Sequence, residues 1–133
     1  MRIELTSVFV DDQAKARTFY TEVLGFQIRH DLPVGDASWL TVVSPQRPEG
    51  PELLLEPAGH PAVQPYREAL RRDGIPLAQF AVDDLAAEHE RLTGLGVVFT
   101  QDPVDIGTAH VAVFDDTCGN LVQLLQLKPP SAD

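Results

Sequence analysis

Cysteine is nearly absent from this chain, which has only Cys118 among its 133 residues. Neither an intrachain disulfide nor an all-cysteine metal cluster can therefore form. Long apolar runs are also missing, since none reaches the roughly 18 residues of a transmembrane helix. The first residues, Met1 to Glu4, lack the long apolar stretch of a secretory signal. These absences predict a cytoplasmic protein with no membrane partner.

Basic residues are scarce: ten Lys and Arg stand against twenty Asp and Glu, giving a net charge of −10. Such a surface repels phosphate backbones, which argues against a nucleic-acid partner. The charge would attract cations, although it also serves simply to keep a protein soluble. The sequence contains no phosphate-binding glycine loop, no Ser-His-Asp arrangement and no basic patch.

Two stretches that resemble each other lie 72 residues apart, Val8 to Asp12 and Phe80 to Asp84. Each is predicted to be a strand that ends in paired aspartates. An amphipathic segment follows the aspartates, and a Leu-Gly pair follows that segment. An aspartate at this place caps a helix, and the glycine ends it. The paired aspartates are therefore interpreted as helix caps rather than as a metal cluster. The repeated pattern predicts that the chain contains two copies of one module.

The chain has the size of one domain. It divides into module 1 (3–57), a connector (58–75), module 2 (76–127) and a frayed tail (128–133). Each module is predicted to follow the order β-α-β-β-β, so that the fold class is α+β. The predicted strands are 3–10, 26–30, 39–43, 52–56, 77–82, 97–101, 109–114 and 121–127, with turns at 33–36 and 102–103 and a short helix at 66–72. Each module leaves one face of its sheet uncovered by its single helix, and two such faces can close around a cavity.

The order of elements resembles the vicinal oxygen chelate superfamily, which includes glyoxalase I, bleomycin-resistance proteins and extradiol dioxygenases. The residues that carry the resemblance are Val10-Asp11-Asp12, Phe19-Tyr20, Leu24-Gly25-Phe26, Phe80 to Asp84, Leu95-Gly96-Val97 and Asp115 to Leu121. The resemblance implies that two βαβββ modules build a cupped, eight-stranded half-barrel around a ligand site. It also implies a homodimer.

Catalytic members of this superfamily hold a divalent ion on four inward-facing strand positions. Counting from the aspartates and from Gly119-Asn120 places these positions at Leu5, Leu54, Leu77 and Gln123. A leucine has no lone pair for a cation, and one amide does not meet the several donors that a divalent ion requires. The sequence therefore predicts no metal and no cofactor.

Strand alternation predicts which residues line the cup. The candidate ligand-binding residues are Ser7, Phe9, Trp39, Glu56, Gln79, His110 and Gln123. Trp39 and His110 are expected at matching places on the third strand of each module. Each has an alternative: Trp39 as a core residue, His110 as a structural histidine. His89 is expected on a solvated helix face, His30 and His60 adjoin predicted loops, and Cys118 lacks a neighbouring base that would make it a nucleophile.

These features favour a metal-free protein that binds a small molecule and sequesters a cationic or aromatic compound. The first alternative is a metal-dependent lyase, isomerase or dioxygenase, and enzymatic activity and catalytic residues stay open. The second alternative is an interaction module whose cup is filled by its own side chains.

Overall fold

The computed structural model describes residues 1–129, so residues 130–133 of the expected frayed tail lie outside the described part. The chain forms two compact units. Unit 1 consists of Met1–Glu68 and Thr117–Gly119, and unit 2 consists of Ala69–Asp116 and the chain from Asn120 onward. None of the helices within residues 1–129 has the length and apolar character needed to cross a membrane.

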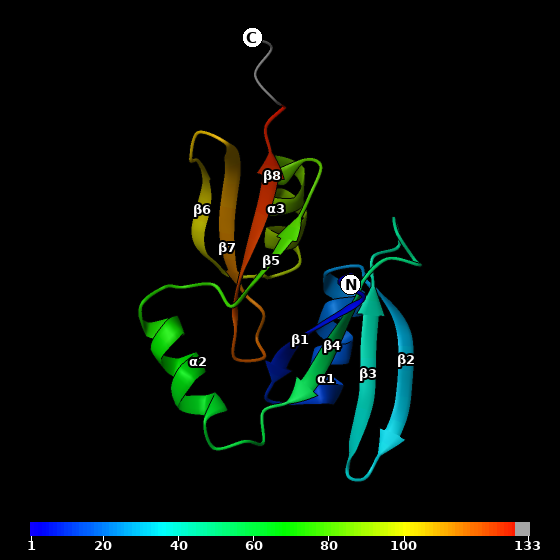
Figure 1. Cartoon of the computed structure of the whole chain (residues 1–133). Helices are drawn as coiled ribbons and strands as arrows, with labels where there is room; N and C mark the ends of the chain where they lie inside the picture. Colours follow the sequence, from blue (N-terminus) through cyan, green and yellow to red (C-terminus); the bar gives the residue numbers. More distant parts are fainter. Residues whose placement is uncertain (130–133) are drawn as a thin grey trace. The chain divides into compact units, whose positions relative to one another are not determined.

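Unit 1 holds one four-stranded mixed sheet, shown in blue to green in Figure 1. Its elements are β1 (Leu5–Val10), α1 (Gln13–Thr18), η1 (Phe19–Val23), β2 (Gln27–Val34), β3 (Ala37–Val43) and β4 (Glu52–Pro57). The strand order is β1-β4-β3-β2, in which β1 runs parallel to β4 and the other neighbours are antiparallel.

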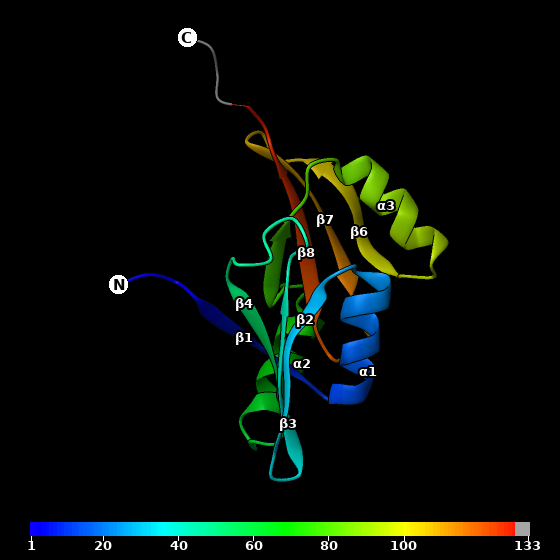
Figure 2. The same ribbon diagram turned by 90° about the vertical axis from the view of Figure 1, so that its right-hand side faces the viewer.

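Unit 2 repeats this plan after the connecting helix α2 (Val63–Arg72). Its elements are β5 (Ala78–Ala81), α3 (Leu85–Gly94), β6 (Phe99–Asp105), β7 (Ala109–Asp115) and β8 (Leu121–Leu127). The strand order β5-β8-β7-β6 matches that of unit 1, and β5 is parallel to β8. Figure 2 shows α3 along one side of this sheet. The predicted order β-α-β-β-β and the α+β class are confirmed in both modules.

The two main helices begin and end by the same devices. The Asp12 side chain accepts hydrogen bonds from the backbone N–H groups of Ala14 and Lys15, and Asp84 accepts one from Ala87. The predicted caps are therefore confirmed. The turns after the helices contain Gly25 at φ +90° and Gly96 at φ +89°. This backbone conformation strains residues that carry a Cβ, so both modules use glycine for the same geometrical reason.

Two strands run longer than predicted, because each continues through a proline. β2 includes Pro33 and reaches Val34 before a two-residue turn at Gly35 and Asp36, and β6 includes Pro103. Both strands lie at the edge of their sheet. An edge strand has one side without ladder partners, so the missing N–H of proline costs it little. The predicted turn at 33–36 is therefore confirmed only at Gly35 and Asp36, and the predicted break at 102–103 was wrong.

The core of unit 1 lies between its sheet and α1–η1. Alternate residues of β1, β3 and β4 are fully or nearly fully buried: Val8, Val10, Leu40, Val42, Leu53 and Leu55. Tyr20 is 0% exposed, and its ring lies 5.8 Å from that of Phe19 and 6.4 Å from that of Phe26. The sheet face carrying these strand residues is called the helix face below, and the candidate site lies on the other face.

Candidate functional site

The second face of the unit 1 sheet combines polar, aromatic and aliphatic side chains and is called the Trp39 face. Paired residues of neighbouring strands point to the same side of a sheet, so the register defines its members. Ser7 pairs with Leu54, Phe9 pairs with Glu56, and Leu54 pairs with Thr41. The members used below are Ser7, Phe9, His30, Leu32, Trp39, Thr41, Glu52, Leu54 and Glu56.

Four of the seven predicted ligand-binding residues lie together on the Trp39 face: Ser7, Phe9, Trp39 and Glu56. Trp39 is 39% exposed and Glu56 is half-buried. Leu32 pairs with Trp39 across β2 and β3 and is 55% exposed, so the indole has an aliphatic neighbour at the surface. The Trp39 face therefore has the indole ring of Trp39 on β3 and the carboxylate of Glu56 on the neighbouring strand β4.

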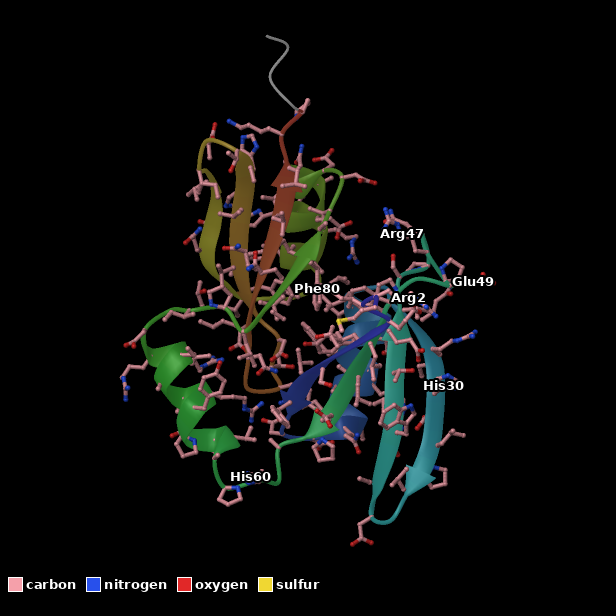
Figure 3. All side chains as sticks on the ribbon, viewed as in Figure 1. Arg2, His30, Arg47, Glu49, His60 and Phe80 are labelled. Atoms are coloured by element: carbon pink, nitrogen blue, oxygen red, sulfur yellow. The ribbon has the colours of Figure 1, made fainter. Side chains whose placement is uncertain are left out.

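A polar cluster that the sequence reasoning missed lies on the same face. The Thr41 hydroxyl donates to Glu52 Oε1 at 2.8 Å and accepts from the backbone N–H of His30 at 3.1 Å. His30 Nε2 lies 3.6 Å from the same Glu52 oxygen. Figure 3 labels His30 on β2, within a strand and not at a loop. Alternation from Trp39 to Thr41 and from Leu54 to Glu52 was the signal that could have found this cluster.

In unit 2 the corresponding face carries two side-chain amides that are bonded to each other. Gln79 pairs with Gln123 in the parallel β5–β8 ladder, and Gln123 Nε2 donates to Gln79 Oε1 at 2.8 Å. Val113 pairs with Gln123 and Val111 pairs with Leu125, so both valines lie on this face, and Gln101 joins it through its pairing with Val113. Gln79 and Gln123 thus share a face as the sequence predicted, with their amides joined to each other.

His110 does not share this face, and the expectation that it would is wrong. It pairs with Gln126, and Gln126 Oε1 accepts a hydrogen bond from the first residue of α3. His110 therefore points to the helix-bearing side of its sheet, opposite Gln123. The proposed match between Trp39 and His110 was off by one residue, and a one-residue slip reverses the face of a strand side chain.

Instead, His110 belongs to a charged group at the end of β6. Its Nε2 lies 3.8 Å from Asp105 Oδ2, and Lys128 Nζ donates to both Asp105 oxygens at 2.7 Å. The hydrogen bond from Lys128, followed by that from the Gly107 backbone N–H, holds the pKa of Asp105 below its usual value of 3.8.

Removing the Lys128 ammonium group with Lys128→Ala should raise the pKa of Asp105 toward that usual value. The pKa of Asp105 is lower in the folded than in the unfolded protein. The pair of Asp105 and Lys128 therefore stabilises the fold at pH values above the unfolded-state pKa, and this contribution is lost as the pH falls through the folded-state pKa. Titration of the Asp105 carboxyl carbon by NMR measures the shift. His110→Asn is the matched control and should move the same pKa less, since His110 is the smallest cause.

The donor set that the resemblance assigns to a metal does not fit a divalent ion. Three of the four positions are leucines, and Leu54 is only 4% exposed. The fourth, Gln123, is engaged by the Gln79 amide. Among residues 1–129, no group of three or more His, Cys, Asp or Glu side chains is close enough to hold a metal ion. We therefore assign no step to a metal.

The remaining singled-out residues are not members of the Trp39 face. His60 Nδ1 accepts from the Ala62 N–H in the loop after β4, where Figure 3 labels it. His89 is part-buried, with its ring 4.5 Å from that of Phe99, so the expectation of a solvated face was wrong. Cys118 is fully buried.

Two βαβββ modules, with matched capping aspartates and matched glycine turns, define a class of duplicated α+β proteins. Residues 2–124 match the sequence profile of the Glyoxalase/Bleomycin resistance protein/Dioxygenase superfamily. The protein belongs to this superfamily, which confirms the resemblance found in the sequence.

The similarity to known proteins extends over nearly the whole chain. YurT of Bacillus subtilis (strain 168) is 48% identical over 95% of this chain and 99% of its own length. The crystal structure of UcmS2 has a TM-score of 0.80 at 35% identity and covers 94% of this chain and 97% of that one. The crystal structure of TnmS3, an antibiotic-binding protein from Streptomyces sp. CB03234, has a TM-score of 0.76 at 29% identity. The match covers 96% of this chain and 97% of that one.

Proposed function

We propose that this protein binds a small aromatic, cationic organic molecule on the Trp39 face and sequesters it without a metal. The observation that carries the proposal is the placement of the half-exposed Trp39 ring on the same face as the Glu52 and Glu56 carboxylates. An indole stacks on flat rings and attracts cations through its π face. The carboxylates supply the opposite charge for an amine or iminium group.

The rest of the face supports this specificity. Leu32 adds apolar area beside the indole, Phe9 adds it next to Glu56, and Ser7 adds a hydroxyl group. Mostly apolar surfaces with a few placed polar groups are typical of small-molecule sites. The net charge of −10 attracts cations over a longer range. The similarity to TnmS3, described as an antibiotic-binding protein, supports a small-molecule ligand.

The chain contains a single tryptophan, Trp39, so the tryptophan component of its fluorescence reports on this face alone. Titration with proflavine, a planar three-ring cation, should quench this fluorescence to saturation. Acridone has the same three-ring outline without the charge and should bind about tenfold more weakly, a difference of about 1.4 kcal/mol. Isothermal titration calorimetry gives both affinities independently of fluorescence.

Glu56→Gln tests the role of the charge and should reduce the affinity for proflavine toward that for acridone. Glu49→Gln is the matched control: Glu49 is an exposed acid in the loop before β4, labelled in Figure 3, and its loss changes the net charge equally. Equal weakening by both variants would contradict a specific role for Glu56. If neither proflavine nor any of a panel of aromatic antibiotics binds, the proposed function is wrong.

A metal-free enzyme is the second candidate, and the proximity of His30 to Glu52 favours it. A carboxylate beside an imidazole is the arrangement of a general base. Compound recovered from the complex and analysed by mass spectrometry separates the two functions: an unchanged compound supports sequestration, and a stoichiometric or catalytic product supports the enzyme.

A further inference from the structure

The amide of Gln13 bridges two strands of the unit 1 sheet. Its Nε2 donates to the backbone oxygens of Ser38 on β3 and Leu55 on β4, both at 2.8 Å. Its Oε1 accepts from the Ser38 N–H at 3.0 Å. One side chain from the first turn of α1 thus satisfies three backbone groups on two neighbouring strands.

These backbone groups lie where the β3–β4 ladder stops. The antiparallel register contains Val42 paired with Leu53 and Thr41 paired with Leu54, and it goes no further. Continuation would pair Leu40 with Leu55, whose carbonyl would accept from the Leu40 N–H. In this structure the Leu55 carbonyl accepts from Gln13 instead. A primary amide placed between two backbone carbonyls requires more room than a direct N–H···O bond, so the strands separate here.

Module 2 provides an internal comparison. Gln13 directly follows the capping Asp12, and the residue that directly follows the capping Asp84 is Leu85. The β7–β8 ladder is unbroken over seven pairs, from Ala109–Leu127 to Asp115–Leu121. Leu85 is 1% exposed and cannot bond to strand carbonyls through its side chain. The interruption therefore occurs in the module that has an amide at this position.

The interruption affects the candidate site directly. The next pair after Leu40 and Leu55 would be Trp39 and Glu56, which a regular ladder would hold about 4.5 Å apart at their Cα atoms. We propose that Gln13 is a positioning residue that keeps Trp39 and Glu56 apart and so sets the width of the opening that accepts a planar, multi-ring cation. The ligand in this inference rests on the proposed function, whereas the separation of Trp39 and Glu56 by Gln13 does not.

Gln13→Leu introduces the residue that module 2 has at the matched position. We expect the ladder to close by further pairs, which would bring the Hα atoms of Trp39 and Glu56 together. A cross-strand Hα–Hα nuclear Overhauser effect between these residues should appear in the variant and be absent from the wild type. The same effect between Thr41 and Leu54 should be present in both and shows that the sheet is folded. Gln13→Met, which keeps the side-chain length and loses the amide, is the second variant.

The binding measurement uses two probes of different width. Proflavine has three fused rings, and benzylamine is a cation with one. Closure of the opening should weaken proflavine binding to Gln13→Leu by tenfold or more and leave benzylamine binding within about twofold. A general loss of stability would weaken both probes alike, so the ratio of the two affinities separates positioning from a structural role.

An altered affinity ratio together with the new Trp39–Glu56 contact supports the inference. An unchanged ratio in both variants overturns it, and so does the absence of the new contact. If wild-type protein binds neither probe nor any of the aromatic antibiotics, the proposed function fails, while the Overhauser effects still decide whether Gln13 holds the strands apart.

Discussion

Gly119→Ala is expected to lower the free energy of unfolding by about 3 kcal/mol, because a Cβ at this position would meet a buried cation. Gly119 has φ +103°, and an added Cβ would lie 2.6–2.8 Å from the Arg67 guanidinium. Arg67 is 4% exposed, and its Nη1 donates to the backbone oxygens of Phe9 and Cys118, both at 2.9 Å. Displacing it would break these charge-assisted bonds inside unit 1.

Gly25→Ala is the matched control for this prediction. Gly25 has a similar φ of +90°, and nothing lies within 4 Å of its would-be Cβ. Its substitution should cost only the conformational strain, roughly 1 kcal/mol. Urea denaturation followed by circular dichroism measures both variants. Equal losses would mean that the contact with Arg67 contributes nothing beyond backbone strain.

Tyr20→Ala should lower the free energy of unfolding by about 4 kcal/mol. Tyr20 is completely buried between the rings of Phe19 and Phe26. It also lies in the π-helical turn η1, and its carbonyl accepts from the Phe26 N–H at 3.0 Å. Removing the ring leaves a cavity that these backbone-fixed neighbours cannot easily fill.

The other tyrosine of the chain serves as the comparison. Tyr66 lies on α2 and is 56% exposed, so Tyr66→Ala should change the free energy of unfolding by no more than about 0.5 kcal/mol. Thermal and urea unfolding of the two variants give the difference directly. A Tyr20→Ala variant as stable as Tyr66→Ala would show that the aromatic cluster does not support unit 1.

The local signals in the sequence were sufficient for the order of elements. Asp12 and Asp84 cap helices, and Gly25 and Gly96 end the segments that follow, for reasons that depend on one turn of backbone. The aspartates repeat after 72 residues and the glycines after 71, and this near-constant spacing indicated the duplication without any knowledge of tertiary structure. Strand alternation likewise placed Ser7, Phe9 and Glu56 on one face.

The parts of the site that escaped prediction depend on register between distant strands. His110 was assigned to the wrong face because the alignment of the modules slipped by one residue at β7. The contact between Thr41 and Glu52 joins two different strands. The contact of His30 with Glu52 also depends on β2 continuing beyond the predicted strand end. The role of Gln13 depends on an interrupted ladder, and no local pattern distinguishes this glutamine from an ordinary residue of a first helical turn.

The prolines in β2 and β6 have a consequence for how these sheets meet other chains. Each lies in a strand at the end of its sheet. A foreign strand that adds to such an edge needs a continuous row of backbone donors, and a pyrrolidine ring interrupts that row. Pro33 and Pro103 therefore protect these two borders against the edge-to-edge growth that leads to aggregates.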